Sequence, residues 1–144
     1  MHIFGWDDPQ QDFQTALSEL LAVVDAAETP VHIVGVSAGG SAALHLLANR
    51  PERVRSIATV ASPHRSVPRY RHPLLMDSLA QLETIQLDPS KVISFYGFFD
   101  ELVPPRYSRS ENIRQVRVPA IGHRITIAVT LTLLAHKVGA QLKR

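Results

Sequence analysis

Three residues of different chemical types stand at or just beyond the ends of strand-like segments in this sequence: Ser37, Asp100 and His123. A serine hydroxyl becomes a good nucleophile when a base takes its proton, and imidazole is suited to that task near neutral pH. A carboxylate on the other ring nitrogen fixes the tautomer and stabilises the imidazolium. The three residue types therefore predict a relay of nucleophile, base and orienting acid.

The serine stands between glycines, in the segment Gly35-Val36-Ser37-Ala38-Gly39. The G-x-S-x-G pattern alone is weak, because a chain of this length meets it by chance in about one case in twenty. Its context is more specific: a predicted strand ends at the motif and a predicted helix begins after it, as in a nucleophile elbow. Gly35 and Gly39 are expected to leave room for a strained serine backbone and for close strand–helix packing. The alternative is an ordinary glycine turn after a buried strand.

The elements that must position these residues alternate along the chain. Short β-branched or apolar runs predict strands at 31–36, 54–61, 91–98 and 114–121. Apolar residues at helical spacing predict helices from the Asp8-Pro9 pair to Ala27, around Leu44 to Ala48, at 75–82 and at about 124–142. This alternation predicts an α/β fold, a three-layer sandwich with a mostly parallel sheet of four or five strands and helices on both faces. The carboxyl ends of its strands are where chemistry is expected.

Length and composition predict one domain, 1–144, of a soluble globular protein: 45% of the residues are hydrophobic and 19% are charged. A net charge of +2 is too small to indicate nucleic-acid binding. Without cysteine, disulfides and thiolate metal sites are excluded. The first residues resemble no secretion signal, and the most apolar stretch, 125–135, is too short to span a membrane. A cytoplasmic location is the expectation.

A short cap-like segment is predicted at about 63–87, between the second and third strands. Its first part, 63–73, contains three prolines, two histidines and the arginines Arg65, Arg69 and Arg71. One interpretation is a basic lid that receives an acidic substrate. The other is a solvated loop, with Arg65 held by backbone carbonyls.

Four segments resemble the α/β-hydrolase family, particularly its lipase and esterase branch. They are VHIVGVSAGGSAAL (31–44) for the nucleophile, TVASPHRS (59–66) after the next strand, YGFFDELVPP (96–105) for the acid and VPAIGH (118–123) for the histidine loop. They occur in the order of that family and the likeness covers roughly 31–140. The resemblance implies Ser37 as nucleophile, Asp100 as acid and His123 as base; Glu101 and Asp88 are rivals for the acid.

The chain also departs from the family, which usually has eight strands with several before the nucleophile. Here 30 residues precede the strand that leads to Ser37, so the sequence resembles a minimal or N-terminally truncated member. The N–H of Ala38 is the expected first oxyanion donor. A turn at Gly5 and Trp6 is the candidate for the second. Loss of the early strands would expose a sheet edge, which predicts a homo-oligomer.

The predicted function is hydrolysis of a small carboxylic ester through an acyl-enzyme, without metal or organic cofactor. A thioesterase, lactonase or peptidase with the same triad is an alternative. So is a catalytically weak module of this fold that binds a ligand or a partner. Trp6, Phe98 and Phe99 are expected either to line a pocket or, for the two phenylalanines, to pack in the core.

Overall fold

Four parallel strands form one sheet in the computed structural model, which describes residues 11–142. They are β1 (Val31–Val36), β2 (Val54–Val60), β3 (Val92–Phe99) and β4 (Arg114–Ile121), and they lie side by side in chain order. Because all are parallel, each must be joined to the next by a crossover, and their carboxyl ends meet at one edge of the sheet. The predicted α/β fold is confirmed, with four strands in the described part of the chain.

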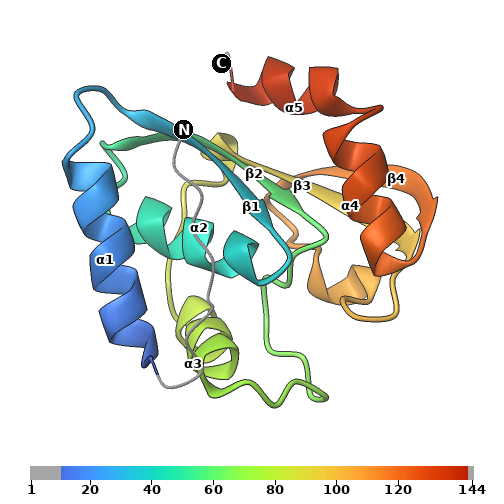
Figure 1. Cartoon of the computed structure of the whole chain (residues 1–144), viewed down its shortest axis with the longest axis horizontal. Helices are drawn as coiled ribbons and strands as arrows, with labels where there is room; N and C mark the ends of the chain where they lie inside the picture. Colours follow the sequence, from blue (N-terminus) through green and yellow to red (C-terminus); the bar gives the residue numbers. More distant parts are fainter. Residues whose placement is uncertain (1–10, 143–144) are drawn as a thin grey trace.

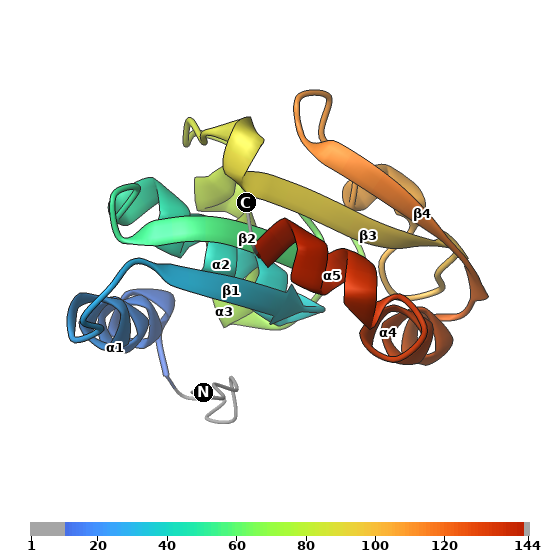
Figure 2. The same cartoon turned by 90° about the horizontal axis from the view of Figure 1, so that it is seen from above.

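Helices cover both faces of the sheet, so the molecule has three layers (Figures 1 and 2). On one face lie α1 (Phe13–Asp25), α2 (Ala38–Asn49) and α3 (Pro73–Leu82), and on the other lie α4 (His123–Leu131) and α5 (Ala135–Leu142). Two short 3-10 helices, η1 (Pro89–Lys91) and η2 (Pro105–Tyr107), precede and follow β3.

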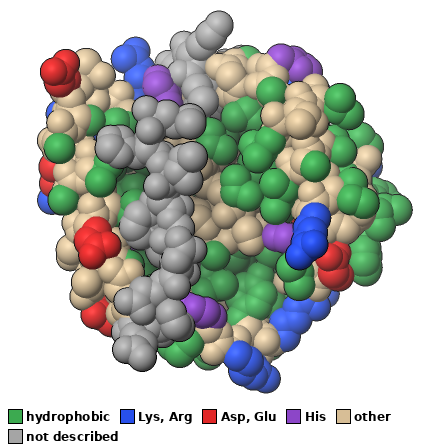
Figure 3. Space-filling view, in the orientation of Figure 1, with side chains coloured by type: hydrophobic (Ala, Val, Ile, Leu, Met, Phe, Trp, Pro, Cys, Tyr) green, Lys and Arg blue, Asp and Glu red, His purple; other side chains and the backbone are tan. Residues whose placement is uncertain are grey.

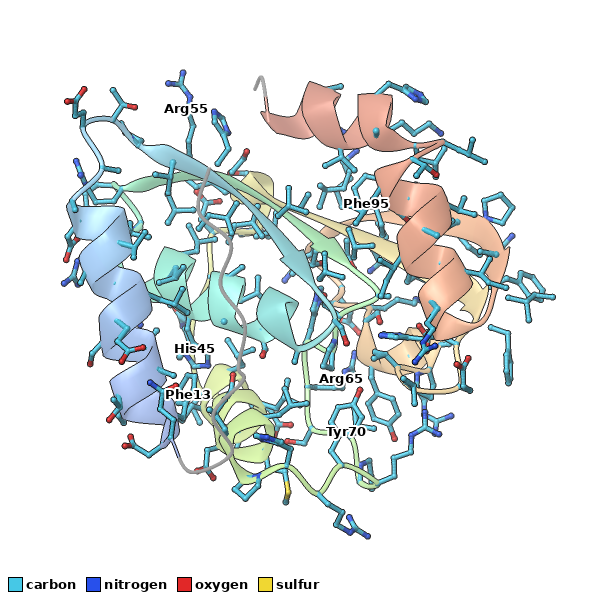
Figure 4. All side chains as sticks on the ribbon, in the orientation of Figure 1. Phe13, His45, Arg55, Arg65, Tyr70 and Phe95 are labelled. Atoms are coloured by element: carbon cyan, nitrogen blue, oxygen red, sulfur yellow. The ribbon has the colours of Figure 1, made fainter. Side chains whose placement is uncertain are left out.

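Neighbouring residues of a strand point to opposite faces, which gives the sheet two separate cores. Ile57 of β2 packs toward α1–α3, whereas Ala58 packs toward α4–α5. Phe95 points from β3 into the second core (Figure 4). Burial of each large apolar side chain stabilises the fold by about 1.5–3 kcal/mol.

The first core also contains a histidine, His45 of α2. Its Nε2 lies 2.9 Å from the carbonyl oxygen of Ser78 in α3, and its ring faces Phe13 of α1 with centroids 4.6 Å apart (Figure 4). Burial lowers the pKa of His45, so the ring is held neutral. His45 is therefore a packed residue of the first core.

Two helix boundaries differ from the sequence-based expectation. Helix α1 begins at Phe13, with Asp12 as its N-cap, whose Oδ1 accepts the Thr15 N–H at 2.9 Å; Asp8 and Pro9 lie outside the described residues. The helix expected at 124–142 is broken at 132–134 into α4 and α5. Threonine hydroxyls of α4 and of its C-cap residue donate to carbonyls four residues earlier, which weakens and bends helices: Thr126, Thr130 and Thr132.

The break lets α5 turn back across the sheet, where Val138 is buried in the second core. Helix α3, predicted as part of a cap, packs instead into the first core through Leu74, Leu79 and Leu82. The loop before it is held near its beginning: the His64 N–H donates to the carbonyl of Tyr107, and the Ser66 N–H donates to Glu83.

No helix in the part of the chain that the structure describes is long and apolar enough to cross a membrane.

Candidate active site

Ser37, His123 and Asp100 meet at the carboxyl edge of the sheet. Ser37 directly follows β1, Asp100 directly follows β3, and His123 is the first residue of α4. The Nε2 atom of His123 lies 3.0 Å from Ser37 Oγ, and its Nδ1 atom lies 2.8 Å from Asp100 Oδ2. The imidazole and the carboxylate are buried, whereas Ser37 is partly exposed. The structure thus brings the three predicted residues into one hydrogen-bonded chain.

The backbone of Ser37 is strained. Its φ of 51° and ψ of −126° are unusual for a non-glycine residue and cost about 1–3 kcal/mol. The surrounding structure compensates, since the Ser37 N–H donates to the carbonyl of Val60 at 2.9 Å and its own carbonyl accepts the Gly40 N–H at 3.1 Å. Ala38 follows as the first residue of α2, where a backbone N–H has no partner within its own helix.

Close packing around this turn depends on Gly35 and Gly40. A Cβ on Gly35 would lie 2.6 Å from the Cα of Gly40, and a Cβ on Gly40 would collide with the side chain of Ser62. At Gly39 there is open space, so the expectation that Gly39 provides this close approach is wrong. The helix turns Gly39 outward and its neighbour inward, toward β2.

Ser62 locks this arrangement from the end of β2, a role the sequence analysis missed. Its buried hydroxyl lies 3.2 Å from the Gly35 carbonyl and 3.0 Å from the Val60 carbonyl, and it donates to this pair. Ala61, just before it, has a φ of 49°, a second strained position beside the turn. A small residue after a strand is the only sequence signal that points to either residue.

Asp100 is held as a carboxylate by several donors. Its Oδ1 accepts the N–H groups of Leu102 (2.9 Å) and Val103 (2.7 Å), while Oδ2 faces His123. Burial alone would raise the pKa of Asp100, but the bonds from His123 and the two amides outweigh it, and the pKa lies below its ordinary value. The side chain therefore stays ionised at neutral pH.

The two rivals of Asp100 have other partners. Glu101 accepts the backbone N–H of His123 at 3.0 Å, at the beginning of α4. The cap position of that helix is Gly122, whose φ of 100° favours glycine and which has no side chain to cap with. Asp88 caps η1 instead, accepting the N–H and hydroxyl of Ser90.

Two side chains of the predicted lid, those of Arg65 and Tyr70, make fixed contacts with other segments. Arg65 donates to the carbonyl of Arg109, the backbone tether that was one of the two interpretations. Tyr70 extends from the same loop, and its hydroxyl donates to the Leu102 carbonyl at 3.2 Å (Figure 4). Burial, with a smaller contribution from the Asp100 charge, raises the pKa of Tyr70 to about 12. The loop is thereby joined to the turn that carries Asp100.

The aromatic candidates for a pocket wall are either exposed or outside the described residues. Phe98 and Phe99 are exposed, so the expectation that they pack in the core is wrong. Gly5 and Trp6, the candidates for a second oxyanion donor and a pocket wall, lie outside the described residues. A pocket of about 280 Å³ lies toward the amino ends of β3 and β4, and none of Ser37, Asp100 and His123 lines it. Its lining residues are Leu44, His64, Leu82, Ile85, Leu87, Pro89, Ser110, Glu111, Asn112 and Ile113. Within residues 11–142 no cluster of His, Asp and Glu has the arrangement of a metal site.

The sequence and the fold of this chain are similar to those of a known protein family. The family described as the alpha/beta hydrolase fold matches residues 26–114. No curated protein matches the sequence significantly.

Several solved structures are similar to the chain. A monoacylglycerol lipase of Paleococcus ferrophilus is 9% identical, with a TM-score of 0.70 over 92% of this chain and 76% of that one. The ydeN gene product of B. subtilis is 17% identical, with a TM-score of 0.70 over 94% and 77%. A meta-cleavage product hydrolase of Pseudomonas fluorescens IP01 is 15% identical, with a TM-score of 0.63 over 94% and 75%. At these identities the likeness shows a common fold.

Proposed function

Since the chain belongs to the alpha/beta hydrolase fold family, we propose that it is a serine hydrolase that cleaves carboxylic esters through an acyl-enzyme. The observation that carries the proposal is the hydrogen-bonded chain from Asp100 through His123 to Ser37, with distances of 2.8 and 3.0 Å. The distance from His123 to Ser37 lies in the range in which a base can take a proton from a nucleophile, and the distance from Asp100 to His123 is that of an acid that orients the base. A structural serine in an ordinary turn needs neither a buried imidazole nor a strained backbone.

In the proposed reaction, Ser37 Oγ attacks the carbonyl carbon of the ester while His123 Nε2 takes its proton. The resulting oxyanion accepts a hydrogen bond from the Ala38 N–H, which directly follows the nucleophile. When the tetrahedral intermediate collapses, His123 returns the proton to the leaving alkoxide, and an alcohol departs. The acyl group stays on Ser37.

Deacylation repeats the steps with water as the nucleophile. His123 Nε2 takes a proton from water, hydroxide attacks the acyl carbon, and the proton passes to Ser37 Oγ as the carboxylic acid leaves. Asp100 faces His123 Nδ1 throughout and stabilises the imidazolium formed in each half. The mechanism requires no metal or organic cofactor.

Ester substrates are proposed over the alternatives on two grounds. One of the similar structures is named a monoacylglycerol lipase, an ester-cleaving enzyme. The segment between β2 and β3 is short and α3 packs into the core, so no helical cap from this segment covers Ser37. A serine without a cap from this segment favours small or loosely held acyl groups. Thioesters, lactones and peptides are the other substrates of the same triad.

The test is hydrolysis of p-nitrophenyl esters from acetate to octanoate by the wild type and three variants. Ser37→Ala is expected to be inactive, and Asp100→Asn to lose about 10⁴ in kcat. Asp88→Asn is the matched control. It removes a carboxylate that caps η1 and is not part of the candidate site, so this variant should keep wild-type rates.

Circular dichroism confirms that each variant is folded. Activity that survives in Ser37→Ala would contradict the assigned nucleophile. A folded wild type that hydrolyses none of the esters would favour the binding module instead.

A further inference from the structure

Five large apolar side chains are exposed together where β3 and β4 end and α4 begins. They are, with their exposed fractions, Phe98 (62%), Phe99 (57%), Leu102 (49%), Ile121 (66%) and Ile125 (56%), and we call them the apolar rim. Phe99 and Ile121 are paired across β3 and β4. Hydrophobic side chains gather on this side of the molecule, with arginine and acidic side chains among them (Figure 3). Contiguous apolar patches of this kind on a soluble domain often mark an interaction site.

The apolar rim borders the candidate active site. Phe99 and Leu102 stand on either side of the turn that begins at Asp100, and Ile121 and Ile125 flank the position of His123. The Ile125 side chain lies within 4 Å of a Cβ built on Gly122, the residue before His123. Any molecule that docks on the rim therefore lies beside the segments that carry Asp100 and His123.

Exposed arginines stand in the segments that border the apolar rim. The guanidinium of Arg117 lies 5.3 Å from the centre of the Phe98 ring, and Arg124 follows His123 directly; both are exposed. Arg69 stands in the loop next to Tyr70, whose hydroxyl contacts the Leu102 carbonyl. Glu101, the acidic side chain here, is engaged with the His123 N–H. Apolar side chains with arginines at their border are suited to an anionic amphipathic surface.

The position of the rim also limits what covers it. A permanently bound protein subunit on this face would lie over the end of the sheet where Ser37 and His123 meet, and would hinder entry of substrate. A lipid surface has no such conflict, because it holds the substrate itself. It takes up aromatic and aliphatic side chains at its boundary and attracts the neighbouring cations.

We propose that the apolar rim docks the protein on anionic lipid surfaces, from which the active site draws amphipathic esters. The inference rests on the proposed function for the identity of the reaction, but the docking itself does not require catalysis. Phe98, Phe99, Ile121 and Ile125 enter the boundary between headgroups and acyl chains, and Arg117 and Arg124 meet the lipid phosphates.

Co-sedimentation with vesicles tests the docking, in the Ser37→Ala background so that no lipid is cleaved. The probes are vesicles of phosphatidylcholine and vesicles of a phosphatidylcholine–phosphatidylglycerol mixture. Phe98→Ser combined with Ile121→Ser is the rim variant. Leu131→Ser combined with Leu133→Ser is the matched control, since both leucines are exposed at the other end of α4.

The parent and the control should bind the anionic vesicles, and the rim variant about tenfold or more weaker. Binding should fall with salt and be weaker on phosphatidylcholine alone. No binding by the parent, equal binding by the rim variant, or equal binding to both vesicles would overturn the proposal. So would a dimer, seen by light scattering, that the rim substitutions dissociate.

Activity on soluble p-nitrophenyl acetate separates this proposal from the proposed function. With Ser37 intact, the rim variant should keep the wild-type rate on that ester and lose rate on esters presented in anionic vesicles. Rim-dependent vesicle binding by a protein that hydrolyses no ester would overturn the proposed function while supporting the docking.

Discussion

At the scale of single residues, Glu101 holds the candidate base through its backbone while Asp100 holds it through its side chain. The Glu101 carboxylate accepts a hydrogen bond from the His123 N–H at 3.0 Å. It thereby caps the N-terminus of α4, because the cap residue Gly122 has no side chain that could accept this bond. Two adjacent carboxylates thus have separate tasks. One orients the imidazole ring, and the other fixes the position of the helix from which that ring extends.

We expect Glu101→Ala to lower the free energy of unfolding by about 1 kcal/mol, the usual cost of losing a helix N-cap acceptor. It should also lower kcat, because the imidazole then moves relative to Ser37. Glu101→Gln keeps an acceptor oxygen at the same place and should retain most of both quantities. Urea denaturation and ester hydrolysis measure the two effects. Equal losses of stability and of kcat in both variants would show that the negative charge of Glu101, and not its hydrogen bond, is responsible for the two effects.

Ser37, Asp100 and His123 could be chosen from the sequence because each stands at a strand end, and parallel strands bring such ends together. Their catalytic roles stay a prediction. The contribution of Gly40 and the exposure of Phe98 were not predictable in the same way. Both depend on which side of an element faces its neighbour, and β3 has a register irregularity between Gly97 and Phe99 that alters the alternation.

At the scale of elements, α2 is positioned by the contact between Gly40 and Ser62. The helix approaches β2 closely enough that no side chain fits there, whereas Gly39 on the same turn meets open space. This close approach fixes how the beginning of α2 lies against the end of β2, on the turn that carries the nucleophile candidate.

Gly40→Ala is expected to destabilise the protein by about 1–3 kcal/mol, the usual cost of overpacking a well-packed site. Gly39→Ala should be neutral or stabilise by up to about 1 kcal/mol, because alanine favours the helix and meets nothing. Thermal unfolding of the two variants provides the comparison. Should both substitutions have the same effect, the close approach of α2 to β2 would be contradicted.

Element types and order were predicted more accurately than their ends. The strands agree to within a residue or two, since short β-branched runs bounded by turns define them closely. Helix α1 begins later than expected because Asp12, rather than Asp8, caps it. The division into α4 and α5 was missed because a continuous apolar pattern does not reveal where a helix must turn back to cover the sheet.

At the scale of the whole molecule, His64 ties the end of β2 to the loop before β4. Its Nε2 lies 3.0 Å from Thr59 Oγ1 and its Nδ1 lies 3.5 Å from Ser110 Oγ, with the ring buried. Burial, assisted by the nearby charge of Arg65, lowers the pKa of His64 to about 4. The native state therefore holds a neutral imidazole in a place where protonation is costly.

A histidine with a lower pKa in the folded than in the unfolded state binds fewer protons when folded, so stability falls as the pH falls. For His64 the window runs from about 6.5, the ordinary value, to about 4. The free energy of unfolding should drop by about 3 kcal/mol across it. His64→Gln should flatten this part of the profile, measured by urea denaturation at several pH values. An unchanged slope in that variant would contradict the assignment; His45, buried as well, adds a smaller change of the same sign.

The homo-oligomer expected from an open sheet edge remains a prediction. In the described part of the chain β1 pairs only with β2, so its outer side has no strand partner there. Pairing of that edge with a second copy is the form we propose, and light scattering at micromolar concentration would show it. The cytoplasmic location is likewise an expectation from the sequence.

The parallel order of the strands bears on how the chain acquires its native structure. No two neighbouring strands can pair as a local hairpin, and the Ser37–His123 contact joins residues 86 positions apart. A high contact order of this kind slows folding, because the chain loses the entropy of closing long loops before the non-local contacts stabilise it. The candidate active site therefore forms only after the crossovers that bring the ends of β1, β3 and β4 together have closed. Until then the chain exposes unpaired strands, and the aggregation hazard of such intermediates is greatest in that interval.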